Sequence, residues 1–153
     1  MNAADMVKDF MIALEAKDYE RAASYLADEF VFSGWTPQPL DKSQFVAVMK
    51  GLKEGIPNLS YHFHTVKDVH DLEQGSSVKA AIQITGAQTE GFILPPLGLP
   101  PIPQTASTVS LPEERWDYML QDDKIVRITV QRVPGGGIQG LLRQLGVDVR
   151  IVQ

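Results

Sequence analysis

The sequence predicts an α+β domain in which N-terminal helices pack on a curved, mostly antiparallel sheet. Apolar residues recur at helical spacing in the first part of the chain, and the period then changes to two. Near the C-terminus, a strand over 109–120, a turn at Asp122-Asp123 and a strand over 124–132 form a hairpin. The covered face of the returning strand would be formed by Val126, Ile128 and Val130. Helices followed by an antiparallel meander are typical of α+β folds.

Three helices are expected before the strands, and each has a recognisable beginning. Asn2 with Asp5, and then Asp18, are of the residue types that cap the first turn of a helix. Asp41 begins the third helix, and Gln44 completes a capping box. The apolar stripes are Val7, Phe10, Met11 and Leu14 in the first helix, Tyr19, Ala22, Ala23 and Leu26 in the second, and Phe45, Val48, Met49 and Leu52 in the third.

The strands that follow alternate in polarity. A short strand over 30–32 ends in a turn at Gly34 that presents Trp35, either as a core plug or as a platform for a ligand. A long strand over 59–69 and another over 78–85 come after the third helix. The faces of the first long strand would be Tyr61 and Phe63 on one side and His62, His64 and Val66 on the other, and Ile82 belongs to the apolar side of the second.

A proline-rich arm over 91–103 interrupts this pattern. So many prolines exclude a helix or a central strand, yet the arm is strongly apolar. It is equally consistent with a segment packed over its own sheet, a lid over a pocket, or a contact with a second subunit. After the hairpin, the glycines of 135–137 act as a hinge before a short amphipathic helix over 138–145.

Length and charge limit the classes of function. A chain of 153 residues fits a single domain spanning 1–153. The net charge of -5 argues against a nucleic-acid or anionic-membrane partner. The absence of cysteine excludes disulfides and thiolate chemistry. No signal peptide or membrane span is evident, which predicts a cytoplasmic protein.

Several segments together resemble a known family. They are the run over 84–92 (Ile-Thr-Gly-Ala-Gln-Thr-Glu-Gly-Phe), the Pro-Pro and Pro-Ile-Pro segment, Trp116-Asp117-Tyr118 and Asp123-Lys124-Ile125-Val126. With this spacing, the chain up to Arg132 resembles the SnoaL-like polyketide-cyclase branch of the nuclear transport factor 2-like superfamily. The resemblance implies a cone-shaped fold, with the concave side of a strongly bent sheet closed by the N-terminal helices around a pocket. It also implies dimers through the sheet.

The residues at the positions that are catalytic in that superfamily cannot act as acids or bases in this chain. The resemblance places the tyrosine and aspartate of isomerase-type members at Phe10 and Gly34, and the histidine and aspartate of cyclase-type members at Ile128 and Val130. Gln88 takes the place of a frequent histidine. These replacements weaken an enzyme hypothesis, although the fold alone does not decide the function.

The remaining polar residues give the candidate site. His64 and Glu114 are the candidate acid and base, because proton transfer requires two such groups at the substrate. We expect the ligand-binding pocket to be lined by Phe10, Trp35, His62, Ile82, Trp116, Ile128, Val130 and Arg132. His62 and His64 alone lack a third ligand, so no metal and no cofactor are expected.

Two functions remain open. The favoured one is a module that binds a small hydrophobic molecule in an apolar pocket. The alternative is an enzyme that isomerises, cyclises or dehydrates a polyketide- or steroid-like substrate by general acid–base catalysis. Tyr61, Phe63 and the proline-rich arm carry more apolar surface than the helices can cover, which predicts a homodimer.

Overall fold

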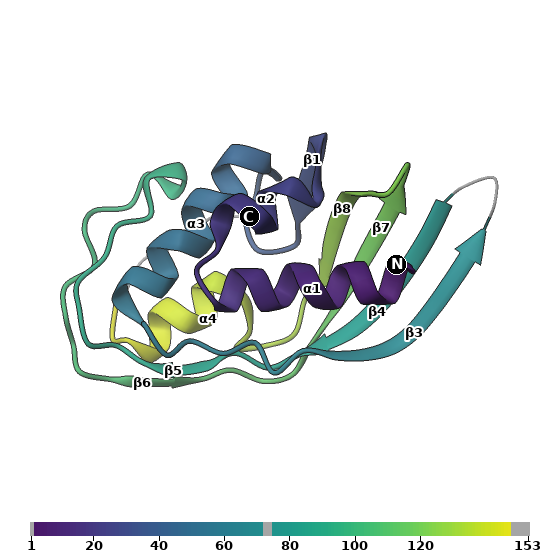
Figure 1. Ribbon diagram of the computed structural model, residues 1–153. Coiled ribbons are helices and arrows are strands. Elements are labelled where there is room, and N and C mark those ends of the chain that lie inside the picture. The colour runs from purple at the N-terminus through teal and green to yellow at the C-terminus, as the bar shows by residue number, and fades with distance from the viewer. Residues whose placement is uncertain (1, 72–74, 148–153) are drawn as a thin grey trace.

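The computed structural model describes residues 2–71 and 75–147 and has the predicted α+β architecture. Helices cover one face of a curved sheet, and α1 (Ala3–Glu15) runs across the strands (Figure 1). In the described part of the chain, the larger sheet has six strands in the order β2-β1-β8-β7-β4-β3. Neighbouring strands are antiparallel except β1 (Leu26–Ser33) and β8 (Lys124–Gln131), which are parallel.

The helix caps that the sequence predicts are all formed. Asn2 accepts a hydrogen bond from the Asp5 backbone N–H at 2.8 Å, and Asp18 caps α2 (Tyr19–Ser24). Asp41 and Gln44 form the predicted capping box of α3 (Lys42–Gly55). Reciprocal bonds of this kind satisfy backbone donors that the first turn of a helix leaves unpaired.

The remaining strands of the larger sheet are β2 (Leu40–Asp41), β3 (His64–Asp71), β4 (Gly75–Ile82) and β7 (Glu114–Gln121). Bulges interrupt the register of the β1/β8, β3/β4 and β7/β8 pairs. An extra residue at a bulge bends its strand and increases the local twist. The bulges therefore account for the curvature that lets the sheet wrap around the helices.

The strand predicted over 59–69 begins only at His64. His62 has a φ of 46°, in the left-handed region, which breaks the alternation of side chains at this point. Ser60 instead forms an isolated bridge with Thr85, and the Gln83 N–H donates to the carbonyl of Tyr61. The expectation that His62 and His64 share one face of a strand is therefore wrong.

The C-terminal hairpin is also shorter than predicted. Its outgoing strand β7 begins at Glu114, and Val109 belongs to β6 (Thr108–Ser110), which pairs with β5 (Thr85–Ala87) in a small second sheet. Because of the bulge between β7 and β8, Ile125 is buried in place of Val126, which is only half-buried. Ile128 and Val130 are buried as predicted.

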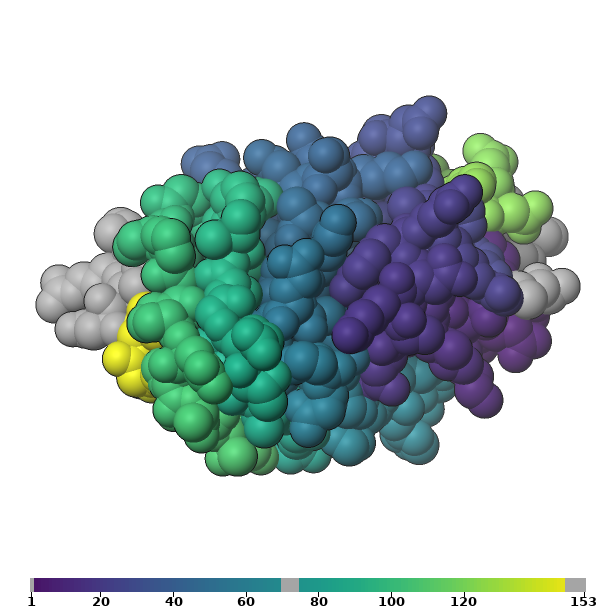
Figure 2. Space-filling model, turned by 60° about the vertical axis from the view of Figure 1, so that its left-hand side comes forward, coloured from purple at the N-terminus to yellow at the C-terminus, as the bar shows by residue number. Residues whose placement is uncertain are grey.

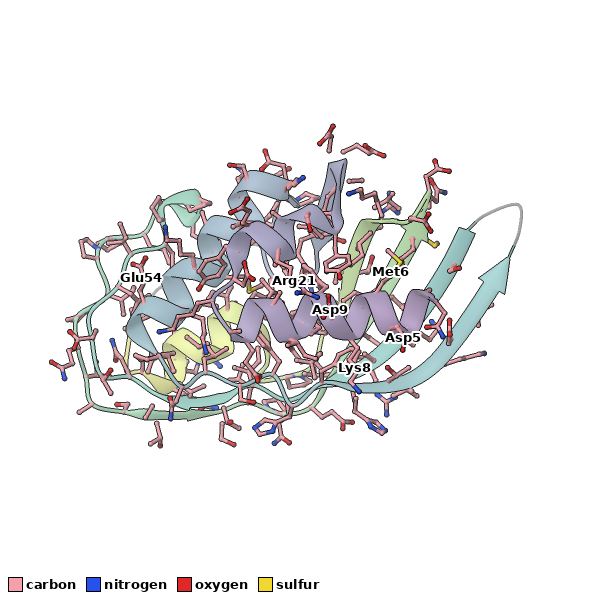
Figure 3. All side chains as sticks on the ribbon, in the orientation of Figure 1. Asp5, Met6, Lys8, Asp9, Arg21 and Glu54 are labelled. Carbon is pink, nitrogen blue, oxygen red and sulfur yellow. The ribbon has the colours of Figure 1, made fainter. Side chains whose placement is uncertain are left out.

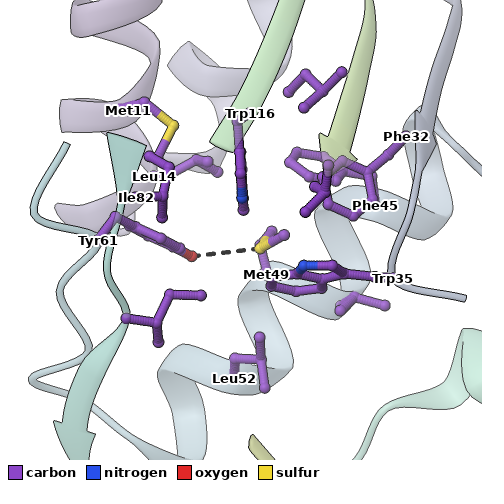
Figure 4. Close-up of a cluster of buried hydrophobic side chains, with 14 of the residues drawn as sticks. Met11, Leu14, Phe32, Trp35, Phe45, Met49, Leu52, Tyr61, Ile82 and Trp116 are labelled. Carbon is purple, nitrogen blue, oxygen red and sulfur yellow. Dashed lines mark hydrogen bonds between the residues drawn. The ribbon is translucent and has the colours of Figure 1, made fainter. Parts of the chain in front are cut away.

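Aromatic side chains fill the space between the helices and the sheet (Figure 4). Trp116 on β7 lies 5.4 Å from Phe32 and 5.7 Å from Trp35, ring centre to ring centre, in edge-to-face geometry. Tyr61 is also buried here, and its hydroxyl donates to the sulfur of Met49 at 3.4 Å. Such packing leaves the middle of the molecule occupied by protein side chains.

The proline-rich arm packs against α3 (Figure 2). It includes a short 3₁₀ helix, η1 (Pro95–Leu97), and its ends are joined by a bridge between Phe92 and Ile102. A Cβ at Gly55 would lie 2.1 Å from the Phe92 ring, so α3 carries glycine at this contact. Phe92 is buried, whereas Ile93 is 52% exposed.

The chain closes with α4 (Gly137–Gln144), beside the end of the sheet at which β8 finishes. Its apolar side chains Ile138, Leu141 and Leu142 are buried. Glycines 135 and 137 adopt left-handed backbone angles, with φ of 80° and 68°. The glycine segment thus makes the turn that brings α4 back onto the core.

Candidate functional site

A pocket of about 200 Å³ lies where the sheet ends and α4 begins. The turn after β1, the start of β7 and the end of β8 meet here, and the glycine segment and α4 form the opposite wall. The lining residues are Gly34, Trp35, Glu114, Arg132, Val133, Gly135, Gly136, Gly137, Ile138, Gln139, Gly140 and Arg143. Three residues of the predicted site, Trp35, Glu114 and Arg132, therefore meet in one pocket.

Glu114 is the buried carboxyl group of this pocket. It is the first residue of β7 and points to the inner face, because it pairs with Ile82 and precedes inward-facing Trp116 by two positions. Its Oε2 accepts a hydrogen bond from the Gly137 backbone N–H at 2.7 Å, and its Oε1 accepts one from Trp116 Nε1 at 3.3 Å. Glu114 thereby ties the start of α4 to the sheet.

Burial and hydrogen bonding act on the Glu114 pKa in opposite directions. Burial is the larger effect and raises the pKa above its ordinary value of 4.5, since a charged carboxylate is poorly solvated there. The N–H groups of Trp116, Gly137 and Trp35 lower the pKa, because they favour the ionised form. A carboxyl group with a raised pKa can exchange protons nearer neutral pH than an exposed glutamate.

Trp35 contributes a polar atom without a partner. The turn at Gly34, where a Cβ would lie 2.3 Å from the Val130 carbonyl oxygen, brings the Trp35 ring over the core. The side chain is 2% exposed, and its Nε1 has no hydrogen-bond partner among the described residues. The indole N–H is close enough to Glu114 to lower its pKa but does not form a hydrogen bond with it.

The glycine segment brings the backbone close to the polar groups of the site. A Cβ at Gly136 would lie 2.9 Å from Glu114 Oε2, and one at Gly137 would lie 3.7 Å from Trp35 Nε1. Glycine therefore lets the backbone approach both polar groups. A hinge was the only role expected of these glycines from the sequence, although three consecutive glycines before a helix are also a signal of close backbone approach.

Two arginines stand at the pocket. Arg132 follows β8, and Arg143 lies in the last turn of α4. Both are exposed, and within the described part of the chain neither forms an ion pair. Arg143 was missed by the sequence analysis, because nothing in the sequence indicates that α4 folds back onto the end of the sheet.

The other predicted lining residues lie elsewhere. Five of them are buried in the aromatic and aliphatic core and do not line this pocket: Phe10, Ile82, Trp116, Ile128 and Val130. Phe10, for example, stacks on Phe45 with ring centres 6.2 Å apart. The exposed ring of His62 forms a hydrogen bond of 2.8 Å with the Thr85 hydroxyl. The expected apolar lining is therefore largely packed protein interior.

His64 and Glu114 do not form the predicted acid–base pair. His64 pairs with Ala81, which in turn pairs with Arg115, so these three side chains share the outer face of the sheet. Glu114 is one position from Arg115 and points to the inner face. His64 is exposed, and the sheet separates it from Glu114. Across the described ranges, no group of three or more potential metal ligands occurs.

Comparison with known proteins identifies the family. The sequence model of the NTF2-like domain matches residues 2–93, which is more than half of the chain. No curated protein matches the sequence significantly.

None of the helices in the described ranges combines the length and apolar character needed to span a bilayer.

Solved structures share the fold along nearly the whole chain. A proposed polyketide cyclase from Pseudomonas putida is 17% identical, with a TM-score of 0.66 over 94% of this chain and 98% of its own. IdmH, a proposed polyketide cyclase from Streptomyces antibioticus, is 17% identical, with a TM-score of 0.65 over 96% and 100%. A SnoaL-like polyketide cyclase from Agrobacterium tumefaciens is 15% identical, with a TM-score of 0.58 over 86% and 91%. At these identities the likeness establishes the fold, and with the match of the family's sequence model it shows that the chain belongs to the NTF2-like family.

Proposed function

We propose that this protein binds a small, partly apolar organic molecule in the pocket between Trp35, Glu114 and α4. The volume of about 200 Å³ is below the roughly 300–1,000 Å³ typical of sites for drug-sized ligands, so the ligand is small. Val133 contributes apolar surface to the pocket, and Glu114, Arg132, Gln139 and Arg143 contribute polar groups. Polar groups placed beside apolar surface are the usual means of fixing the orientation of a ligand.

The observation that carries the proposal is the unpartnered N–H of Trp35. Leaving a buried donor without an acceptor costs about 1–3 kcal/mol. Trp35 Nε1 is such a donor, and its residue lines the pocket. The nearby Glu114 carboxyl group offsets part of this cost, and a ligand oxygen that accepted a well-formed hydrogen bond would remove the rest, so binding of an oxygen-containing compound is favoured here.

The proposal can be tested by following the indole N–H signals in proton–nitrogen correlation NMR spectra. The chain has only two tryptophans, and the variant Trp35→Phe assigns both signals while retaining an aromatic ring. Titration with a library of small oxygen-containing compounds should shift the Trp35 signal for some of them. Trp35→Phe should bind those compounds more weakly. A library without hits, or hits that bind Trp35→Phe as tightly as the parent, would refute the proposal.

A second candidate function is acid–base catalysis by Glu114. Burial raises the pKa of this carboxyl group, and a carboxyl group of this kind suits proton transfer next to a carbonyl group. Isomerisation or cyclisation of a polyketide- or steroid-like compound requires such a step, and the similar structures include proposed polyketide cyclases. A pocket of about 200 Å³ would take only the reacting end of such a compound. In this case Glu114 would act alone as acid and base, without the partner His64 that the sequence predicted.

The enzyme hypothesis has its own test. Ketones and β-keto acids that bind to the protein are incubated with it in deuterated water, and deuterium uptake next to the carbonyl group is measured. Catalysed exchange that Glu114→Gln abolishes and Glu113→Gln retains would support catalysis. Binding without catalysed exchange would contradict the enzyme hypothesis and support only the binding function.

A further inference from the structure

We infer that the ligand of this pocket is a small organic acid whose carboxylate binds between Arg132 and Arg143. The inference rests on the proposed binding function and specifies the chemistry of the ligand. A guanidinium group matches a carboxylate with two parallel N–H groups, which makes arginine the usual residue for recognising such an anion. Two arginines at one pocket of about 200 Å³ are therefore an arrangement suited to a carboxylate.

The arginines reach the pocket from separate parts of the chain. Arg132 comes from the end of β8 and Arg143 from the last turn of α4. Arg21 and Arg115, by contrast, lie within 4.0 Å of the carboxylates of Asp9 and Glu113. Arg132 and Arg143 thus line one pocket, and neither has an ion-pair partner in the described ranges.

The backbone at the start of α4 already binds one carboxylate. The Gly137 N–H at the start of α4 donates to Glu114, and the N-terminus of a helix carries partial positive charge. The next N–H groups, of Ile138 and Gln139, have no acceptor within the helix, because the first bond of the α4 ladder runs from the Gly140 N–H to the Gly136 carbonyl. Together with the unpartnered N–H of Trp35, they make the wall of the pocket rich in donors.

The charges in the pocket also fix the orientation of the ligand. Glu114 is buried, whereas Arg132 and Arg143 are exposed at the rim. The ligand carboxylate therefore binds at the rim, where it stays apart from the Glu114 carboxyl group. The body of the ligand then lies against Val133 and the glycine segment, and a second oxygen faces the Trp35 N–H. The predicted class is a small cyclic acid with a hydroxyl or keto group opposite its carboxylate.

The test uses the full chain and three matched probes. These are 4-hydroxybenzoate, its uncharged isostere 4-hydroxybenzamide, and benzoate, which lacks the second oxygen. We expect 4-hydroxybenzoate to bind about tenfold or more tightly than the amide, because a hydrogen bond to a charged group is stronger than one between neutral groups. Benzoate should bind with intermediate affinity and should shift the Trp35 indole signal least.

Three variants locate the binding site. Arg132→Gln and Arg143→Gln should each weaken 4-hydroxybenzoate binding about tenfold and leave the amide nearly unchanged. Arg127→Gln is the matched control, because Arg127 is an exposed arginine of β8 on the outer face of the sheet. All three side chains are exposed, so the variants should fold. Thermal unfolding of each variant checks this.

The outcomes separate this inference from the proposed function. If the amide binds as tightly as the acid, or if the arginine variants bind both equally well, the inference is overturned while a binding pocket remains. If neither these probes nor the wider library shifts the Trp35 signal, the proposed function fails and the inference fails with it. If inorganic sulfate competes at the same concentration and Arg127→Gln also weakens binding, the protein attracts anions non-specifically and the inference is overturned.

Discussion

Replacing Glu114 with glutamine should destabilise the protein by about 2 kcal/mol at pH 5. Glutamine has nearly the same shape but turns one of the two acceptor oxygens into an NH₂ group. One of the two N–H groups that now donate to Glu114, from Gly137 or Trp116, would then face another donor. A buried donor that loses its acceptor costs about 1–3 kcal/mol. For a chain of this size, 2 kcal/mol lowers the melting temperature by about 4–8 °C.

The loss of stability caused by Glu114→Gln should become smaller as the pH rises. Burial raises the Glu114 pKa above its ordinary value of 4.5, so between that value and the raised pKa the folded protein binds more protons than the unfolded chain. The contribution of Glu114 to stability is then complete below pH 4.5 and falls as the pH rises through the pKa of the folded state. Glutamine does not titrate, so the difference in stability between parent and variant narrows over this range.

Urea unfolding of the parent and of Glu114→Gln at several pH values between 4.5 and 8 measures both effects. Glu113→Gln is the control, because the Glu113 side chain is 58% exposed and its contact with Arg115 is a surface ion pair of 3.6 Å. Its effect should stay within about 0.5 kcal/mol at every pH. A stability difference for Glu114→Gln that widened with rising pH would refute the reasoning, because the N–H groups would then outweigh burial.

Three further predictions follow from other parts of the structure. Gly140→Ala should lower the free energy of unfolding in urea by at least about 2 kcal/mol, because the new Cβ would lie 2.0 Å from the Gly135 carbonyl oxygen. The control Gly98→Ala has open space around it and should lower this free energy by about 1 kcal/mol, because Gly98 has a left-handed backbone. The hydrogen bond from the Tyr25 hydroxyl is the largest effect that lowers the pKa of Asp9, and the hydrogen bond from Arg21 is the next (Figure 3). NMR titration should therefore find the Asp9 pKa below 3.8, and Tyr25→Phe should raise it. The stability that depends on this carboxylate is lost as the pH falls through the lowered pKa. We also predict a homodimer through the outer face of the sheet, where the apolar side chains of Val69 and Met119 flank Ser77 and are 40% and 39% exposed. Sedimentation at micromolar concentration should show a dimer, and Met119→Asp should dissociate it. A monomeric parent protein would contradict this prediction.

The parts of the fold that the sequence predicts well are those decided by local chemistry. The capping residues Asn2, Asp18 and Asp41 accept hydrogen bonds from backbone N–H groups three positions away, so their effect can be recognised in the sequence alone. The β7–β8 hairpin is similar, because its alternating strands and the turn at Asp122-Asp123 are close in the chain. In both cases the deciding contacts are local.

The errors arise where a contact far along the chain decides the local conformation. His62 leaves the strand pattern because the segment around it pairs with the residues near Thr85, which follows β4. A bulge opposite Leu120 exchanges the places of Ile125 and Val126. Glu114 could be singled out from the sequence, but its true neighbour, Gly137, lies 23 positions away and was recognised only as part of a hinge.

The aromatic core also explains why the candidate site lies at the end of the sheet. Phe10, Ile128 and Val130, the positions at which the family resemblance led us to expect catalytic groups, are all buried in the core. Phe10 stacks on Phe45, and Phe32 connects Phe45 to Trp116, so these rings occupy the interior that a ligand would need in a hollow cone. Glu114, Arg132 and Arg143 line open space where the strands end, and α4 with the glycine segment supplies the opposite wall. Because the centre of the scaffold is filled, we propose this pocket at the end of the sheet, and not a central cavity, as the place where a small molecule binds.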